Sequence, residues 1–320
     1  MKVTNQKKIT SNRGSATLCP WPTFISSIYI NDISSALLYS KAFVFADDTA
    51  LLYSNKDPKK IRKHVNTDLK LLLKWLKANK ISLNVKKIEM ILFTEKRKKS
   101  NYEIKIKLDG KKLFPAKSIK YLGIYLDEHL TWNHQTEFLA NKLRRANGML
   151  SNLRHYVPRK LLRTAYYAIF QSNLVYGLQV WGQNLPLNCR IEKLQKSAVR
   201  IMTFSNPTAH SKPLFERLNI PRLSHLLFSN NIKLAHQTLN QITPVAIRNI
   251  LNLRYISNPY TTRNARIKLL SRPFIRTRKF GFKSIRYQVI LDWNSLQEKN
   301  KYIDLAGTRL SIVNQLVRTE

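Results

Sequence analysis

Apolar and aromatic residues dominate the stretch from Phe43 to Tyr53, and the acidic pair Asp47 and Asp48 lies at its centre. Short runs of β-branched and aromatic residues are typical of buried strands, so each flank of the pair predicts a strand. Because the two carboxylates interrupt the apolar run, we expect a β-hairpin with the pair at or near its turn. We also expect its strands to join a small antiparallel sheet with residues 89–93.

A period of three to four residues predicts amphipathic helices over much of the remaining chain. The clearest example follows Asp57-Pro58, a typical helix start, and its apolar positions are Ile61, Val65, Leu69, Leu72 and Leu76. Asn79 is the expected end of this helix. Similar spacing predicts helices at 24–38, 138–153, 158–177, 191–201 and 223–239, and strand-like patterns occur at 103–108 and 119–127.

The charge balance of the chain is extreme. Its 320 residues include 56 Lys and Arg but only 18 Asp and Glu, which gives a formal net charge of +38. Residues 217–291 contain basic side chains and not one Asp or Glu. Solvated protein surfaces normally mix both signs, so this excess predicts binding to a polyanion, with nucleic acid as the first candidate and a charged membrane surface as the alternative.

Cysteine content and hydropathy narrow the expected environment. Cys19 and Cys189 are the only cysteines, and their separation suggests neither a disulfide framework nor a metal-ligand motif. No run of 18 apolar residues is present, so we expect no membrane-spanning helix. Residues 18–30 follow a basic start but contain two prolines and no small-residue cleavage site, which argues against a signal peptide. The expected location is intracellular, in the cytoplasm, the nucleus or both.

The acidic pair could be a polar turn and nothing more, because Asp is a favoured turn residue. Adjacent carboxylates also repel each other, and a cation relieves that repulsion. Carboxylate oxygens suit Mg²⁺, which proteins commonly bind through one or two carboxylates together with substrate phosphates. Asp47 and Asp48 are therefore candidate ligands of Mg²⁺, or of Mn²⁺ in its place.

The string Phe45-Ala46-Asp47-Asp48, bracketed by predicted strands, resembles the metal-binding hairpin of reverse transcriptases, above all those of jockey-like non-LTR retrotransposons. The order of further motifs strengthens the resemblance: Gly14-Ser15, Tyr29-Ile30-Asn31-Asp32, Leu83-Asn84 with Lys87, and Tyr121-Leu122-Gly123. The helical stretches after Trp132 are similar to the thumb region of these polymerases.

The resemblance implies RNA-directed DNA synthesis, with an RNA template, a DNA primer and deoxynucleotides as partners. Asp47 and Asp48 would then be the catalytic, metal-binding residues. Gly14, Ser15 and Lys87 would lie near the nucleotide or its phosphates, although Lys87 could equally be a solvated loop lysine. Residues of the primer grip would be Tyr121, Leu122 and Gly123. The basic residues expected to contact nucleic acid are Arg144, Arg145, Arg276, Arg278 and Lys279.

The predicted fold class is α+β. We expect a truncated polymerase palm, with a small antiparallel sheet and helices, at 1–127, an all-helical thumb at 128–245 and a basic carboxyl-terminal segment at 246–320. The palm of the family uses a third carboxylate on a strand before the Gly14-Ser15 loop, but residues 1–12 contain no Asp or Glu, and the fingers are also missing. The expected function is therefore an incomplete reverse transcriptase, inactive as this chain. The alternative is a non-catalytic protein derived from such an element that binds nucleic acid without sequence preference, and nothing indicates a specific protein partner.

Overall fold

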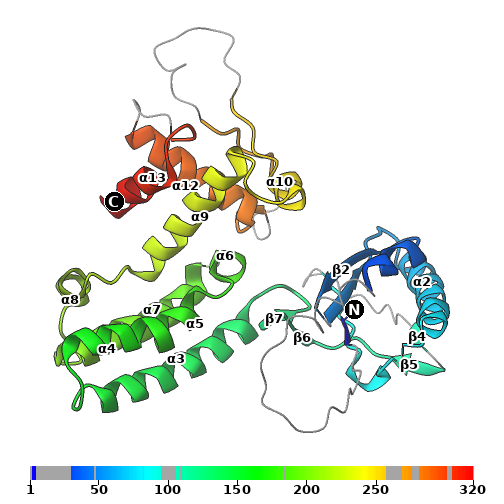
Figure 1. Ribbon diagram of the computed structural model, residues 1–320, viewed down its shortest axis with the longest axis horizontal. Helices are drawn as coiled ribbons and strands as arrows, with labels where there is room; N and C mark the ends of the chain where they lie inside the picture. The colour runs from blue at the N-terminus through cyan, green and yellow to red at the C-terminus, as the bar shows by residue number, and fades with distance from the viewer. Residues whose placement is uncertain are drawn as a thin grey trace, which may run out of the picture. The chain divides into compact units, whose positions relative to one another are not determined.

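The computed structural model describes residues 2–4, 30–46, 48–81, 83–94, 106–108, 110–183, 185–256, 269–275, 281–300 and 305–319. The chain forms two compact units, Met1–His134 and Gln135–Glu320, called here the first and second unit (Figure 1). The first unit combines strands and helices and the second is helical, so the predicted α+β class is confirmed. The finer boundaries at 127 and 245 stay predictions.

The first unit contains the predicted hairpin, formed by β2 (Lys41–Phe45) and β3 (Asp48–Leu52). Its sheet has the order β1-β3-β2, and β1 (Lys2–Thr4) pairs antiparallel with β3. The expected pairing with residues 89–93 is wrong in the described part of the chain, where Met90 instead forms a parallel bridge with Pro115. An apolar run predicts that a strand exists but does not identify its neighbour, and Met90 is already buried in the core.

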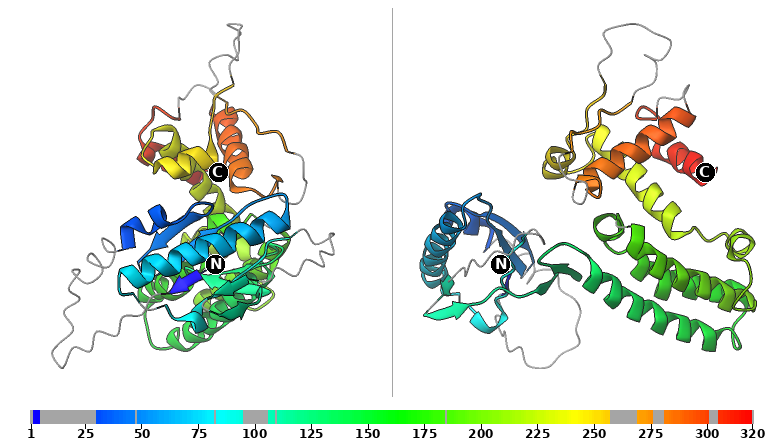
Figure 2. Two further views of the ribbon diagram at one scale, coloured as in Figure 1. Left: turned by 90° about the vertical axis from the view of Figure 1, so that its right-hand side faces the viewer. Right: turned by 180° about the vertical axis from the view of Figure 1, so that it is seen from behind.

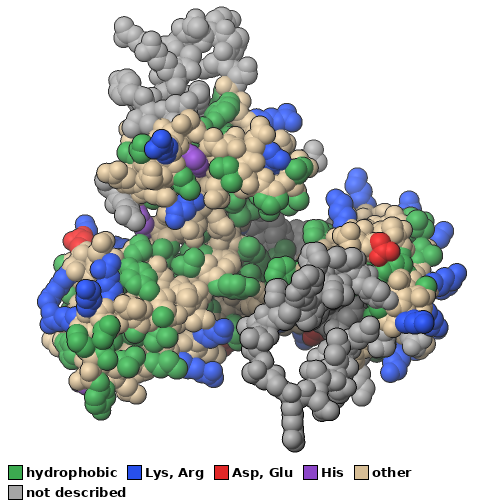
Figure 3. Space-filling model, viewed as in Figure 1, with side chains coloured by type: hydrophobic (Ala, Val, Ile, Leu, Met, Phe, Trp, Pro, Cys, Tyr) green, Lys and Arg blue, Asp and Glu red, His purple; other side chains and the backbone are tan. Residues whose placement is uncertain are grey.

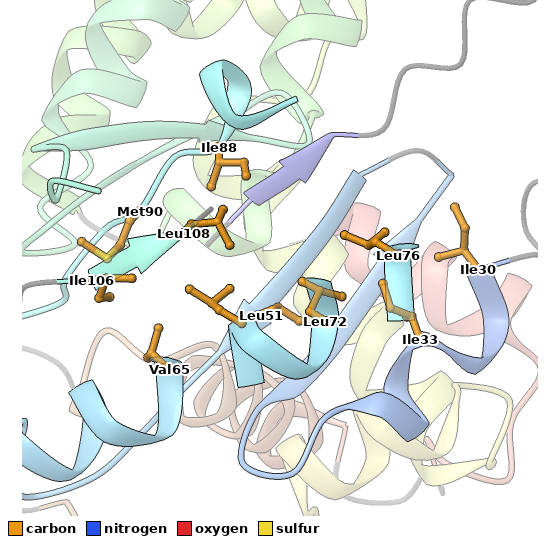
Figure 4. Packing of buried hydrophobic residues seen from close by; sticks show 11 residues of the cluster. Ile30, Ile33, Leu51, Val65, Leu72, Leu76, Ile88, Met90, Ile106 and Leu108 are labelled. Atoms are coloured by element: carbon orange, nitrogen blue, oxygen red, sulfur yellow. The ribbon is translucent and has the colours of Figure 1, made fainter. Parts of the chain in front are cut away.

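Helix α2 (Pro58–Ala78) supplies much of the core of the first unit. Its start is as predicted, because the Asp57 side chain accepts a hydrogen bond from the Lys59 amide at 2.9 Å. Figure 4 shows how its apolar face meets the hairpin and the strands that follow. The buried cluster comprises Ile30, Ile33, Leu51, Val65, Leu69, Leu72, Leu76, Ile88, Met90, Ile106 and Leu108.

The remaining elements of the first unit are short. The helix predicted at 24–38 is described only from Ile30 onward, where it is the 3₁₀-helix η1 (Asn31–Ala36). A second 3₁₀-helix is η2 (Val85–Lys87). Two further antiparallel hairpins follow, made by β4 (Ile106–Leu108) with β5 (Lys111–Leu113) and by β6 (Ser118–Tyr121) with β7 (Ile124–Asp127).

In the second unit, α3 (Asn133–Leu153) and α7 (Leu185–Thr203) lie side by side (Figures 1 and 2). Asn147 Nδ2 of α3 donates to the Leu194 carbonyl of α7 at 3.1 Å. The predicted helix at 158–177 is α4 (Arg159–Ala165), the π-helix η3 (Tyr166–Gln171) and α5 (Ser172–Val175) in succession. The short helix α6 (Leu178–Trp181) follows.

Helix α9 (Leu223–Leu239) has the predicted bounds, and it contacts α6 and α7 as well as helices that follow it in the chain. Its carboxyl-terminal half packs against α12 (Ile285–Lys299) and α13 (Leu310–Thr319), around the buried Trp293. Two shorter helices, α8 (Ser211–Leu218) and α10 (Val245–Leu251), precede and follow α9. None of the helices in the described ranges is both long and apolar enough to cross a bilayer.

Candidate active site

The tip of the β2–β3 hairpin carries the candidate carboxylates. Phe45 pairs with Asp48, so the strands are connected through Ala46 and Asp47. Ala46 has a φ of 48°, the left-handed conformation that two-residue hairpin turns require at their first central position. Asp48 is the first residue of β3 and is half-buried, while Asp47 lies outside the described residues. The hairpin prediction is therefore confirmed, and one of its two carboxylates is described.

A buried carboxylate that the sequence analysis missed binds the backbone segment just before this hairpin. Asp68 of α2 is fully buried, and its two oxygens accept hydrogen bonds from three consecutive backbone amides. Leu38 N lies 3.1 Å from Oδ1, Tyr39 N lies 3.1 Å from Oδ2, and Ser40 N lies 2.9 Å from Oδ2. Because Lys41 is the first residue of β2, this clamp fixes the entry to the hairpin strand. A signal was present, since Asp68 is the only acidic residue of α2 and lies among its apolar positions.

Tyr39 and Tyr53 lie on either side of the β2–β3 hairpin in the sequence. The Tyr39 ring stacks on the His64 ring of α2, with centroids 4.0 Å apart and planes inclined by 4°. Burial, aided by the charge of Asp68, raises the pKa of the Tyr53 phenol well above its usual value. The Tyr53 phenol therefore stays neutral even at strongly alkaline pH.

The predicted primer-grip residues form the turn between β6 and β7. Tyr121 pairs with Ile124, and the two residues between them, Leu122 and Gly123, have φ values of 46° and 81°. Positive φ at both central residues is the type I′ geometry of a tight hairpin. Burial raises the pKa of the Tyr121 phenol, and the Asp48 charge raises it further. The structure thus brings this turn within electrostatic reach of the candidate carboxylate.

Lys87 is the last residue of η2, and its side chain is exposed. η2 contacts β1, and β1 is the neighbour of β3, so Lys87 and Asp48 belong to elements of one small assembly. Figure 4 shows the adjacent Ile88 close to β1. The phosphate-binding role of Lys87 stays a prediction.

The other candidate residues are less well defined by the structure. Gly14 and Ser15, near the expected nucleotide site, and Arg276, Arg278 and Lys279, in the basic segment, lie outside the described residues. Arg144 and Arg145 are exposed on α3, and Arg144 Nη1 donates to Asn141 Oδ1. Both arginines belong to the second unit. Because their side chains are exposed, a polyanion can reach them.

The hairpin offers two carboxylates to a divalent cation, which is fewer ligands than a complete coordination shell requires. Within the described ranges, no group of three or more His, Cys, Asp or Glu side chains could hold a metal ion. Asp48, with Asp47 beside it in the sequence, offers carboxylate oxygens of the kind that Mg²⁺ prefers. Two carboxylates suffice only where substrate phosphates complete the coordination, which is the usual arrangement for this ion.

Comparison with known proteins identifies related sequences. Residues 19–126 match the family of reverse transcriptases (RNA-dependent DNA polymerases). The chain is 32% identical over 166 residues to a probable RNA-directed DNA polymerase from transposon BS of Drosophila melanogaster, covering 50% of this chain and 18% of the relative. It is 25% identical over 190 residues to the RNA-directed DNA polymerase from mobile element jockey of the same organism, covering 57% of this chain and 20% of the relative.

The alignments define how far the likeness extends. The chain spans about a fifth of the length of these relatives, and no solved structure matches it. Asp47, Asp48, Lys87 and residues 121–123 fall inside the family match, whereas Gly14 and Ser15 precede it. The resemblance to jockey-like reverse transcriptases, predicted from the Phe-Ala-Asp-Asp string and the order of motifs around it, is confirmed.

Proposed function

We propose that residues 19–126, the segment that matches the reverse transcriptase family, supply the metal-binding carboxylates of an RNA-directed DNA polymerase from a jockey-like non-LTR retrotransposon. The single observation that carries this proposal is the β2–β3 hairpin, with Asp48 at the first position of β3 and Asp47 before it in the sequence. The turn that begins at Tyr121 supports it, because the charge of Asp48 acts on the Tyr121 phenol.

The proposed reaction is attack of a primer 3′-hydroxyl on the α-phosphate of a deoxynucleoside triphosphate, directed by an RNA template. The hydroxyl loses its proton, the new bond joins its oxygen to the α-phosphorus, and the bond to the β-phosphate breaks with release of pyrophosphate. Asp47 and Asp48 would hold Mg²⁺, or Mn²⁺ in its place, and the ion would supply stabilisation of negative charge at the reacting oxygens. Lys87 lies near the phosphates, and residues 121–123 support the primer end. Asp68 keeps the entry to β2 in place and so positions the carboxylates.

A second candidate function is binding of nucleic acid without catalysis, in an intracellular compartment. It is favoured by the net charge of +38 and by the absence of Asp and Glu from residues 1–12 and 217–291. Figure 3 shows Lys and Arg side chains at many places on the viewed face and few Asp or Glu. Such a surface attracts any polyanion, so the expected binding is strong, salt-dependent and insensitive to sequence.

The basic segment provides a test of this second function. Reversing Arg276, Arg278 and Lys279 to Glu should weaken binding to all RNA and DNA sequences alike and flatten the dependence of affinity on salt. Fluorescence anisotropy with two unrelated oligonucleotides at several salt concentrations measures both effects. An unchanged affinity and slope would assign the excess charge to another role.

The metal-binding proposal is tested by paramagnetic broadening. Mn²⁺ titrated into the full chain should selectively broaden the methyl signals of Ala46 and Ala50, which flank the carboxylates. The double variant Asp47→Asn, Asp48→Asn should abolish this selectivity. Glu89→Gln is the matched control, because Glu89 is an exposed acid of the same unit and lies outside the hairpin. Equal broadening in the double variant would refute the proposal.

A further inference from the structure

An exposed apolar surface lies at α10 in the second unit, where this helix packs against α9 and α12 (Figure 1). Ile242, Ile250 and Val245 are 69%, 61% and 60% exposed, and Ile247 is 37% exposed. Residues three and four apart are neighbours on a helix surface, so Ile250 lies beside Ile247 and the exposed Ala246. We call these five residues, Ile242, Val245, Ala246, Ile247 and Ile250, the α10 patch.

The α10 patch is held in place although its side chains face solvent. Leu251, the last residue of α10, is only 1% exposed and anchors the helix. The Ile242 N–H donates to the Gln237 carbonyl at 2.9 Å, and the residue before it, Gln241, has a φ of 59°. A residue at this position of a helix end usually packs back on its own helix, but the residues that Ile242 would meet there, His236 and Gln237, are polar. The end of α9 therefore offers Ile242 no apolar partner at those positions.

Cations gather at the carboxyl-terminal end of α10. Arg248 lies in its last turn. Two further arginines bind Asn252, the residue that follows α10: Arg254 Nε donates to the Asn252 Oδ1 atom at 3.2 Å, and Arg286 Nη2 donates to the Asn252 carbonyl at 3.4 Å. Among the described residues none of these three arginines forms an ion pair, and residues 217–291 contain no Asp or Glu. The positive charge beside the patch therefore favours a negatively charged partner.

Aliphatic side chains next to uncompensated cations restrict what can cover the patch. A second copy of this chain would bring another net charge of +38, and like charges repel. Single-stranded nucleic acid stacks its bases on aromatic rings, and the five residues of the patch include none. Helices that lie in a membrane interface carry a long apolar face with Trp or Phe, whereas α10 has seven residues and neither of these. A protein helix with an apolar face and acidic flanks matches both features of the patch.

We propose that the α10 patch docks an acidic amphipathic helix of a partner protein. The apolar face of that helix covers Ile242, Val245 and Ile250, and its carboxylates pair with Arg248 and Arg254. Docking of an amphipathic helix on an apolar surface is a common mode of protein recognition, and complementary charges speed the encounter and select the partner. The proposal goes beyond the polymerase and nucleic-acid functions, because the ligand is a protein and the patch lies outside the family match.

A pair of designed peptides separates the patch from the general attraction of a basic chain for acidic ligands. The probe is a labelled peptide of about 18 residues, or five helical turns, with leucine on one face and glutamate on the other. Its scrambled form has the same composition and charge but no apolar face. The full chain should bind the probe about tenfold or more tightly than the scrambled peptide in fluorescence anisotropy, because burial of one aliphatic side chain is worth at least that factor.

Two double variants locate the binding. Ile242→Ser with Ile250→Ser should reduce the affinity for the probe to the affinity for the scrambled peptide. Leu161→Ser with Val180→Ser is the matched control, because it removes two exposed apolar side chains of the same unit outside the patch. The control should bind the probe as the wild type does.

The charged part of the proposal has its own variant. Arg248→Gln with Arg254→Gln should weaken binding of the probe severalfold, whereas a probe with Gln in place of every Glu should bind this variant and the wild type alike. In methyl NMR spectra of the wild-type chain, the Ile250 signal should shift on addition of the acidic probe. The signal of Ile312, exposed on α13, should not shift.

Equal affinities for the probe and the scrambled peptide would overturn the proposal, as would an unchanged affinity in the Ile242, Ile250 variant. If that variant lost co-sedimentation with phosphatidylserine-containing vesicles but still bound the probe, an anionic membrane would replace the partner helix. If it lost a concentration-dependent dimer in sedimentation velocity, a second copy of the chain would replace it. Neither a metal ion nor nucleic acid enters these measurements, so this proposal and the proposed function fail separately.

Discussion

Replacing Asp68 by Asn tests how the hairpin is positioned. The substitution preserves shape but replaces one of two accepting oxygens with an NH₂ group that faces backbone N–H donors. The carboxylate accepts from Leu38, Tyr39 and Ser40 in a fully buried site, and hydrogen bonds to charged groups are worth about 1.5–3 kcal/mol each. Loss of one such bond and the cost of an unpaired donor, about 1–3 kcal/mol, together give a destabilisation of about 3–5 kcal/mol.

Hydrogen exchange followed by mass spectrometry is the suitable assay, because it reports on each unit of the chain separately. In Asp68→Asn, amides of β2 and β3 should exchange at least a hundredfold faster, the factor that corresponds to about 3 kcal/mol, and α9 should not change. Asp57→Asn is the matched control on the same helix, since Asn caps helices about as well as Asp. If the two variants exchanged alike at the hairpin, the clamp would not hold β2.

Burial raises the pKa of Asp292 from 3.8 to about 6, so the folded state is destabilised as pH rises through that interval. Relative to the wild type, the free energy of unfolding of Asp292→Asn in urea should increase by about 2.4 kcal/mol between pH 4 and 7.5, while Glu298→Gln, which removes an exposed acid of the same helix, should leave it unchanged. Gly123→Ala should destabilise the protein by about 1 kcal/mol and lower its thermal midpoint, because alanine is strained at the Gly123 φ of 81°. Leu122→Asn should raise the thermal midpoint, because Asn tolerates positive φ better than Leu. Changes of the same sign in the two variants would contradict the assigned turn. The 320-residue chain alone should not extend a DNA primer on RNA with Mg²⁺ or Mn²⁺; extension that disappears in Asp47→Ala would show that it carries a sufficient site.

The sequence pattern predicted the hairpin and the amphipathic helices, whose formation depends on residues that are close together in the chain. The acidic pair in an apolar run located the hairpin, and the Asp57-Pro58 start with its three-to-four-residue period located α2. Helix α9 was predicted from its first residue to its last for the same reason. In each case the side chains that form the element lie within a few turns or strand residues of one another.

Features that depend on distant parts of the chain were not predicted. The neighbour of β3 is β1 and not residues 89–93, because strand pairing is decided by the whole core. Asp68 was overlooked since its partners lie 28 to 30 residues away. Residues of seven helices between 163 and 314 line one cavity of the second unit, and no periodicity indicates that they meet.

The π-helix η3 also has a genetic consequence. Its closing hydrogen bond runs from Ser172 N to the Tyr167 carbonyl, five residues back, so it accommodates one residue more than an α-helical turn. Deleting a single codon, such as that of Ala168, would restore α-helical spacing and rotate everything after it by about 100° relative to α4. Gln171 and the helices after it would then point in a new direction relative to α4, although none of the remaining residues had changed its identity. Related genes that differ here by a one-residue gap should therefore encode proteins in which the same residues line different surfaces of the second unit.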